Sequence, residues 1–111
     1  MVLTQLRHIK LWYAGKLKDW ELAGYELDRI SENLVRAALL CANIPIENIK
    51  AVTTPIGDLR DAIATKNIEK IIRGYSRLTT ACNSCHIAGN VGFIRLQTPT
   101  SSMFSDEPYG R

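Results

Sequence analysis

Two cysteines and a histidine near the C-terminal end of the sequence have the types and the spacing to hold a prosthetic group. They belong to the run Cys82-Asn83-Ser84-Cys85-His86, which matches the C-x-x-C-H pattern. In that pattern two thiols bond to the vinyl groups of a haem and the adjacent histidine binds the iron. On a helix, residues i, i+3 and i+4 share one face, so both sulfur atoms can reach one edge of the porphyrin. The motif predicts one covalent haem c, attached through Cys82 and Cys85, with His86 as the proximal iron ligand.

The sixth coordination position of such an iron separates electron transfer from the binding of a small gas. His8 is the only other histidine, and it lies in the first predicted helix beside Leu11 and Trp12. We consider it as a distal ligand, against the plainer interpretation of a half-exposed histidine. Met103 is a weaker alternative because it lies in the tail. An open or water-bound iron is the third alternative.

The same cysteine spacing also occurs in zinc sites and in redox dithiols. A zinc site usually has four protein ligands, and the remaining Cys41 and His8 are far away in the sequence. A thioredoxin-like dithiol requires a βαβ setting, which the helical pattern of this chain does not offer. Both alternatives therefore rank behind haem, and we interpret Cys41 as a buried, unreactive thiol.

Two helices are predicted in the first half of the chain. Apolar residues at helical spacing run from about Leu3 to Ala14, and we expect Gly15 to end this helix. Asp19 is the expected N-cap of the second helix, whose apolar stripe continues for about six turns. That helix must end before Pro45, because the residue ahead of a proline disfavours the helical conformation.

Two further helices are predicted in the second half. Thr54 and Pro55 have the types for an N-cap and a first helical residue, which predicts a shorter third helix that reaches Thr65. Asn67 is the expected cap of the fourth helix, which continues to a stop at residues 89–90. The haem motif lies on the apolar stripe of this last helix, so we expect an attached haem to lie between helices.

An irregular tail follows, because proline, glycine, serine and threonine residues interrupt any helix after residue 91. The fold class predicted is therefore all-α, a four-helix bundle over about residues 3–89 with an irregular C-terminal tail over about 91–111. Residues 1–111 form one domain. The apolar residues expected to pin the tail to the bundle are Phe93, Ile94, Leu96 and Phe104. The aromatic residues expected in the core are Trp12, Tyr13, Trp20, Tyr25 and Tyr75, and a haem slot is expected beside Tyr75 and Leu78.

The composition excludes several classes of function. The chain is 46% hydrophobic and 23% charged, as in a folded soluble domain, and lacks the ~18 continuous apolar residues of a membrane span. Its 14 basic and 11 acidic residues are interspersed, which argues against nucleic-acid binding. We find no acid–base pair, phosphate-binding loop or nucleophile–histidine–carboxylate set, so we do not expect an enzyme.

Three segments resemble a known family. Residues 11–15, 19–23 and 78–86 read LWYAG, DWELA and LTTACNSCH, and they are similar to a family of small, largely uncharacterised bacterial cytochrome-like proteins. A short bundle with the haem motif near the end of its last helix also resembles the class II c-type cytochromes, the group that contains cytochrome c prime. The likeness extends to about Gly89. The chain departs from that group in its shorter helices and in the segment 87–111 that follows the motif.

These observations predict a one-haem electron carrier that works with a redox partner protein. Attachment of c-type haem normally occurs outside the cytoplasm, so we expect a periplasmic or similar location. The first residues do not form a secretory signal, which this interpretation therefore takes to have been removed. The alternative function is a five-coordinate haem module that binds or senses NO or CO. A non-haem bundle with a zinc or dithiol site ranks third, and pairing of two copies through an apolar helix face is compatible with each.

Overall fold

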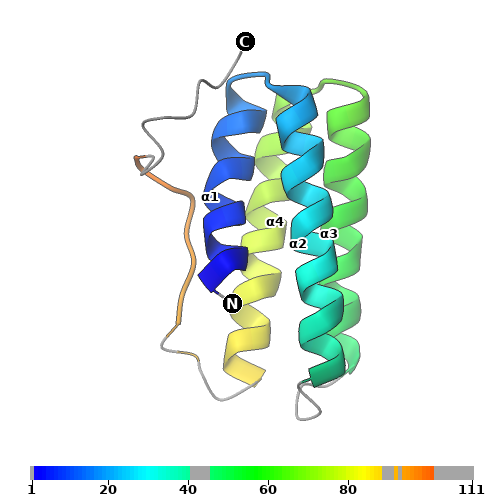
Figure 1. Cartoon of the computed structure of the whole chain (residues 1–111), viewed down its shortest axis with the longest axis vertical. Helices are drawn as coiled ribbons and strands as arrows, with labels where there is room; N and C mark the ends of the chain where they lie inside the picture. The colour runs from blue at the N-terminus through cyan, green and yellow to red at the C-terminus, as the bar shows by residue number, and fades with distance from the viewer. Residues whose placement is uncertain (1, 41–45, 89–91, 93, 102–111) are drawn as a thin grey trace.

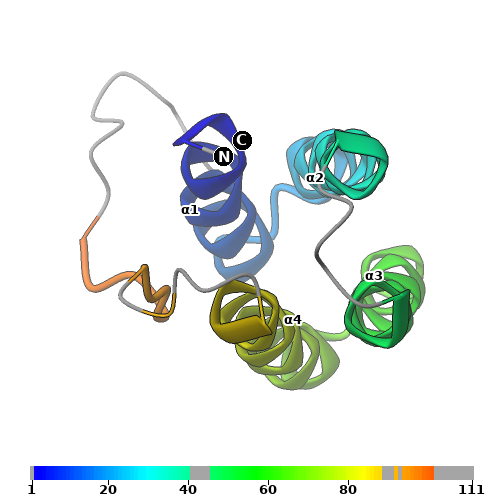
Figure 2. The same ribbon diagram turned by 90° about the horizontal axis from the view of Figure 1, so that it is seen from below.

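The computed structural model of this chain is an up-down-up-down bundle of helices (Figure 1). It describes residues 2–40, 46–88, 92 and 94–101. The four helices are α1 (Val2–Lys16), α2 (Trp20–Leu40), α3 (Ile46–Ala64) and α4 (Ile68–Ala88). Seen along the bundle, α1 lies beside α2 and α4, and α3 closes the ring between them (Figure 2). The predicted four-helix bundle is confirmed.

Two similar turns connect α1 to α2 and α3 to α4. Each contains a lysine in the left-handed region, Lys18 with φ of 64° and Lys66 with φ of 54°. The next residue, Asp19 or Asn67, donates its backbone N–H to the carbonyl five residues earlier, at 2.8 and 3.0 Å, which is the Schellman pattern. The side chain of the same residue then accepts a backbone N–H three residues later, at 3.4 and 3.2 Å. Both predicted N-caps are confirmed.

Gly15 lies inside α1, so the prediction that it ends this helix is wrong. The left-handed residue that ends the helical path is Lys18. Gly15 instead allows close packing, because a Cβ atom there would lie 2.9 Å from Cγ2 of Ile71 on α4. The glycine therefore marks a place where α1 and α4 approach closely.

Pro55 lies inside α3, so the predicted start of the third helix at Thr54 and Pro55 is also wrong. A proline inside a helix removes one hydrogen bond, but tertiary packing can compensate for that loss. Here Pro55 and its neighbours Val52 and Ile56 are all buried. The apolar face of α3 thus continues through the proline, and packing against the bundle outweighs the local stop signal.

The hydrophobic core fills the space between the four helices. Trp12 and Tyr75 belong to it, and Tyr13 and Trp20 pack against it half-buried, as predicted for aromatic residues. Tyr25 is 51% exposed on α2, so the prediction is wrong for this residue. In the described part of the chain, no helix is long and apolar enough to cross a membrane. The buried hydrophobic residues are Leu11, Trp12, Ala14, Ala23, Leu27, Ile30, Val52, Ile56, Leu59, Ala62, Ile71, Tyr75, Leu78, Ala81 and Cys82.

The described part of the tail, residues 94–101, runs back as an extended segment along the outer side of α1 and α4 (Figures 1 and 2). Leu96 packs against the core, which confirms that it helps to pin the tail. The side chain of Ile94 is 43% exposed, so it does not serve as an apolar anchor. Phe93 and Phe104 lie outside the described residues.

Candidate haem site

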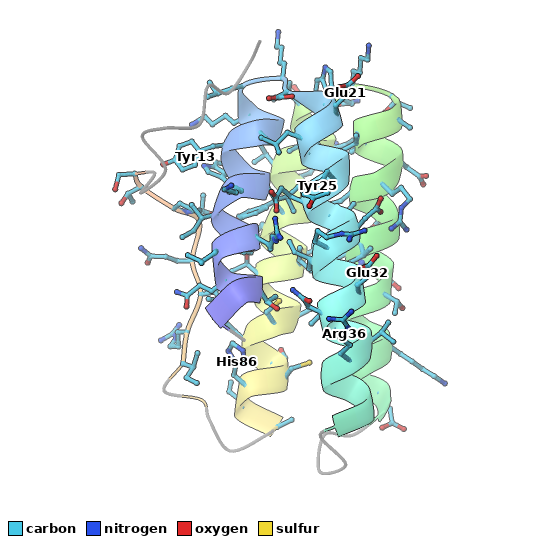
Figure 3. All side chains as sticks on the ribbon, viewed as in Figure 1. Tyr13, Glu21, Tyr25, Glu32, Arg36 and His86 are labelled. Carbon is cyan, nitrogen blue, oxygen red and sulfur yellow. The ribbon has the colours of Figure 1, made fainter. Side chains whose placement is uncertain are left out.

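The Cys-x-x-Cys-His motif lies on the last turns of α4, at the end of the bundle where α1 begins (Figure 1). Cys82 is 8% exposed and belongs to the core, and Cys85 packs against that core half-buried. His86 is half-buried on the side of α4 that faces the tail (Figure 3). The motif therefore continues the buried stripe at Cys82 and reaches the surface at His86.

A backbone carbonyl of the tail holds the imidazole of His86. Nδ1 of His86 lies 2.8 Å from the carbonyl oxygen of Ile94. Because a carbonyl only accepts hydrogen bonds, Nδ1 must carry the hydrogen and donate it. In the neutral ring the lone pair is then on Nε2. Proteins commonly orient a metal-binding histidine through such a bond from its other ring nitrogen.

Asn83, which stands between the two cysteines, binds the tail through two hydrogen bonds. Its Nδ2 donates to the carbonyl oxygen of Leu96 at 2.9 Å, and its Oδ1 accepts the N–H of Leu96 at 2.7 Å. The side-chain amide thus pairs with the backbone as a neighbouring strand would. The C-x-x-C-H pattern gives no role to Asn83, so this contact was not predicted from the sequence. The sequence signal that could have indicated this contact is the position of Asn83 one helical turn before His86, which places both side chains on one side of the helix.

The two thiols of the motif are not joined in a disulfide, and they are poorly ionised. Burial raises the pKa of Cys82 to about 11, with a further contribution from the charge of Cys85. Burial also raises the pKa of Cys85. Reactive dithiols and zinc sites work through thiolates, whose pKa is lowered. Among the residues that the structure describes, no group of three or more His, Cys, Asp or Glu is arranged to hold a metal ion. The zinc and dithiol alternatives gain no support here.

His8 is buried in the core between α1 and α4, with 3% of its surface exposed. Its Nδ1 lies 2.8 Å from the hydroxyl of Tyr75, and its Nε2 lies 2.8 Å from the hydroxyl of Thr79. The rings of His8 and Tyr75 are stacked, with centroids 4.4 Å apart. The interpretation of His8 as half-exposed is therefore wrong, because two hydroxyl groups of α4 satisfy both ring nitrogens inside the core.

His8 contacts α4 at Tyr75 and Thr79, before the first residue of the haem motif. Thr79, which contacts Nε2 of His8, precedes His86 by two helical turns, or about 10 Å along α4. Both ring nitrogens of His8 already have partners in this conformation. The packing therefore gives no support to His8 as a distal ligand. Met103 and Cys41, the other residues singled out from the sequence, lie outside the described residues.

The core beside the motif is filled by side chains. Tyr75 and Leu78 both have 0% of their surface exposed. Among the described residues, Tyr75 and Leu78 thus border no open slot, and the haem slot expected beside them is not seen in this conformation. The reason is the packing of Tyr75 against His8 and Trp12, whose ring centroids lie 4.4 and 4.9 Å from its own.

The donor set at the end of α4 nevertheless fits a covalently attached haem. Two thiols that form no disulfide have the required spacing on one helix, and the Nδ1 hydrogen of His86 is engaged, so Nε2 is the nitrogen left for a metal. No family model, no curated protein and no solved structure matches the chain. The resemblance to bacterial cytochrome-like proteins thus stays a prediction drawn from the three segments 11–15, 19–23 and 78–86.

Proposed function

We propose that this protein is a c-type cytochrome that holds one haem and transfers electrons. The observation that carries the proposal is the hydrogen bond from Nδ1 of His86 to the carbonyl oxygen of Ile94, within a C-x-x-C-H motif. This bond orients the imidazole and leaves Nε2 as the metal-binding nitrogen. A histidine that served only as a surface residue would not need a fixed tautomer.

Each residue of the motif has a distinct role in this proposal. Cys82 and Cys85 would anchor the haem through thioether bonds, and His86 would be the proximal ligand. A haem iron so bound would supply a one-electron ferrous–ferric couple. Because Cys82 lies in the apolar core, it would tie one edge of the group to a region of low dielectric constant, which influences the reduction potential. Electron transfer requires no substrate chemistry, so we propose a redox protein as the partner and a location outside the cytoplasm.

Binding of a small gas such as NO or CO is the second candidate function. The position of His8 favours it, because both ring nitrogens of His8 are engaged by Tyr75 and Thr79, which lie about two turns and one turn before Cys82 on α4. If His8 does not bind the iron, the sixth position is open unless the tail supplies Met103. A haem with an open position binds exogenous ligands when reduced.

Spectra of protein produced with c-type haem maturation would separate these two functions. Sharp low-spin bands that do not change when CO is added to the reduced form would support electron transfer with six-coordinate iron. A Met103→Ala variant would then lose those bands if the tail supplies the ligand. High-spin bands that shift with CO would support gas binding. Failure to incorporate haem covalently would contradict both functions.

A further inference from the structure

We propose that Asn83 is a positioning residue for His86. By pairing with the backbone of Leu96, its side-chain amide keeps the carbonyl oxygen of Ile94 against Nδ1 of His86. The effect on a bound iron rests on the proposed function. The effect on the imidazole itself is a property of the protein chain and can be tested without haem.

The geometry of the two segments explains why two contacts occur together. Asn83 and His86 are three residues apart on α4, so their side chains lie on one side of the helix. In an extended chain the backbone polar groups of residues i and i+2 point in the same direction. Ile94 and Leu96 have that relation, and both turn backbone groups toward α4. Two neighbouring side chains of the helix therefore meet two neighbouring positions of the tail.

The side chain of Leu96 fixes the register of this pairing, because it packs against the core next to α4. Sliding the tail by one residue would turn Leu96 outward and would turn the Ile94 carbonyl away from His86. Asparagine suits the position because its amide has both a donor and an acceptor. Aspartate keeps only the acceptor, and leucine, which has a similar shape, has neither.

The consequence for His86 is a fixed tautomer and a fixed ring orientation. With the Ile94 carbonyl in place, the hydrogen stays on Nδ1 and the lone pair on Nε2 points away from the tail. A hydrogen bond to the other ring nitrogen also makes a metal-binding histidine a stronger electron donor. Loss of the Asn83 pairing should therefore weaken donation to iron and favour the reduced form.

The first test uses the full chain without haem. The variants are Asn83→Leu and Asn83→Asp, with Ser84→Ala as the matched control, because Ser84 is the exposed neighbour inside the same motif. We expect the amide hydrogen of Leu96 to exchange about tenfold faster in Asn83→Leu. Nitrogen-15 NMR of the His86 ring should show the Nδ1–H tautomer in the wild type and a mixture of both tautomers in Asn83→Leu. Ser84→Ala should behave as the wild type.

Asn83→Asp provides a second variant that keeps the bond from the N–H of Leu96. Asn83→Asp should show a smaller increase in the exchange rate of the Leu96 amide hydrogen and a partial change of the His86 tautomer. If Asn83→Leu does not fold, Asn83→Asp decides the test. The proposal is overturned if both Asn83 variants match Ser84→Ala in Leu96 exchange and in the His86 tautomer. It is equally overturned if Leu96 exchange rises while the tautomer stays fixed, because Asn83 would then hold the tail without positioning His86.

The second test uses the haem-loaded protein. We expect Asn83→Leu to raise the midpoint potential relative to Ser84→Ala and, where the ferrous iron is five-coordinate, to lower the iron–histidine stretching frequency. An unchanged potential together with an unchanged stretching frequency would overturn the positioning role and leave the haem proposal intact. A wild-type chain that takes up no haem would instead sink the proposed function, and the tautomer measurement would still decide the role of Asn83.

Discussion

The hydroxyl oxygen of Tyr75 lies 2.8 Å from Nδ1 of His8 and donates to the carbonyl oxygen of the same histidine, also at 2.8 Å. The hydroxyl of Thr79 meets the other ring nitrogen. Because the Tyr75 hydroxyl gives its one hydrogen to the carbonyl of His8, Nδ1 must donate to the Tyr75 oxygen. A neutral ring then accepts at Nε2 from the hydroxyl of Thr79, which can otherwise donate to the carbonyl oxygen of Tyr75 at 3.0 Å. Burial lowers the pKa of His8 from 6.5 to about 4, which keeps the ring neutral at physiological pH. His8 thus joins α1 to α4 as an uncharged residue.

This pKa predicts that the protein loses stability in mild acid. Between about pH 4 and pH 6.5 the unfolded chain binds a proton at His8 that the folded chain excludes, so the free energy of unfolding falls as the pH falls through this range. The full displacement of the pKa corresponds to a loss of about 3 kcal/mol. Urea denaturation of the haem-free chain at about pH 7 and at about pH 4 measures this loss.

A His8→Gln variant serves as the comparison, because glutamine can donate and accept hydrogen bonds but does not titrate. It should be less stable than the wild type near neutral pH and should lose less stability on acidification. The difference between the two pH dependences isolates His8 from the carboxyl groups that titrate in the same range. Parallel pH profiles for the two proteins would show that His8 does not have the lowered pKa.

The same variant predicts an outcome for the iron. Because His8 contacts Tyr75 and Thr79 and not the end of α4, haem-loaded His8→Gln should keep the visible spectrum of the wild type in both oxidation states. A His86→Gln variant should alter the visible spectrum in both oxidation states. This control shows how large a change the loss of an iron ligand produces. Conversion of a low-spin spectrum to a high-spin one by His8→Gln would identify His8 as the sixth ligand and would contradict this expectation.

A pair of glycine substitutions tests the close packing of α1 on α4. Gly15→Ala places a methyl group 2.9 Å from Cγ2 of Ile71, so we expect a destabilisation of about 1–3 kcal/mol. Gly24→Ala, at the fifth residue of α2, meets no atom within 4 Å and should stabilise the protein by up to about 1 kcal/mol through helix propensity. Thermal denaturation followed by circular dichroism gives both values. Equal effects of the two substitutions would mean that α1 and α4 are not packed as described.

The buried thiols should react slowly in the haem-free chain. Burial raises the pKa of Cys82 to about 11, and Cys82 is less exposed than Cys85. Iodoacetamide at neutral pH should therefore modify Cys82 more slowly than Cys85. Each thiol is measured alone in a Cys41→Ser background in which the other cysteine of the motif is also replaced by serine. Mass spectrometry then gives the rate of modification. In denaturant the two rates should converge. A fast-reacting Cys82 would revive the redox-dithiol alternative.

Local signals in the sequence were enough to predict the helices where the cap residues and the apolar spacing agree. Asp19 and Asn67 cap α2 and α4 as expected. The two errors concern residues whose usual local role is overridden by packing. Gly15 allows a close approach to Ile71 where a helix end was expected, and Pro55 is held inside α3 by the buried face around it. Such roles depend on the neighbouring helix, which the local sequence does not specify.

For the candidate site, the spacing of Cys82, Cys85 and His86 was readable because it follows from the helix alone. The partners of His86 and Asn83 could not be predicted in the same way. They are backbone atoms of the tail, and every residue type carries such atoms. His8 shows the same limit. Its place beside the apolar stripe indicated partial exposure, whereas the hydroxyl groups of α4 that bury it belong to a distant part of the sequence.

The measurement that tests the central claim most directly is the intact mass, under denaturing conditions, of the full chain produced with c-type haem maturation. We expect a mass increase of one haem in the wild type and in Cys41→Ser. We expect no such stable product when Cys82 and Cys85 are both replaced by serine. A wild-type chain that retains its unmodified mass under these conditions would contradict the account.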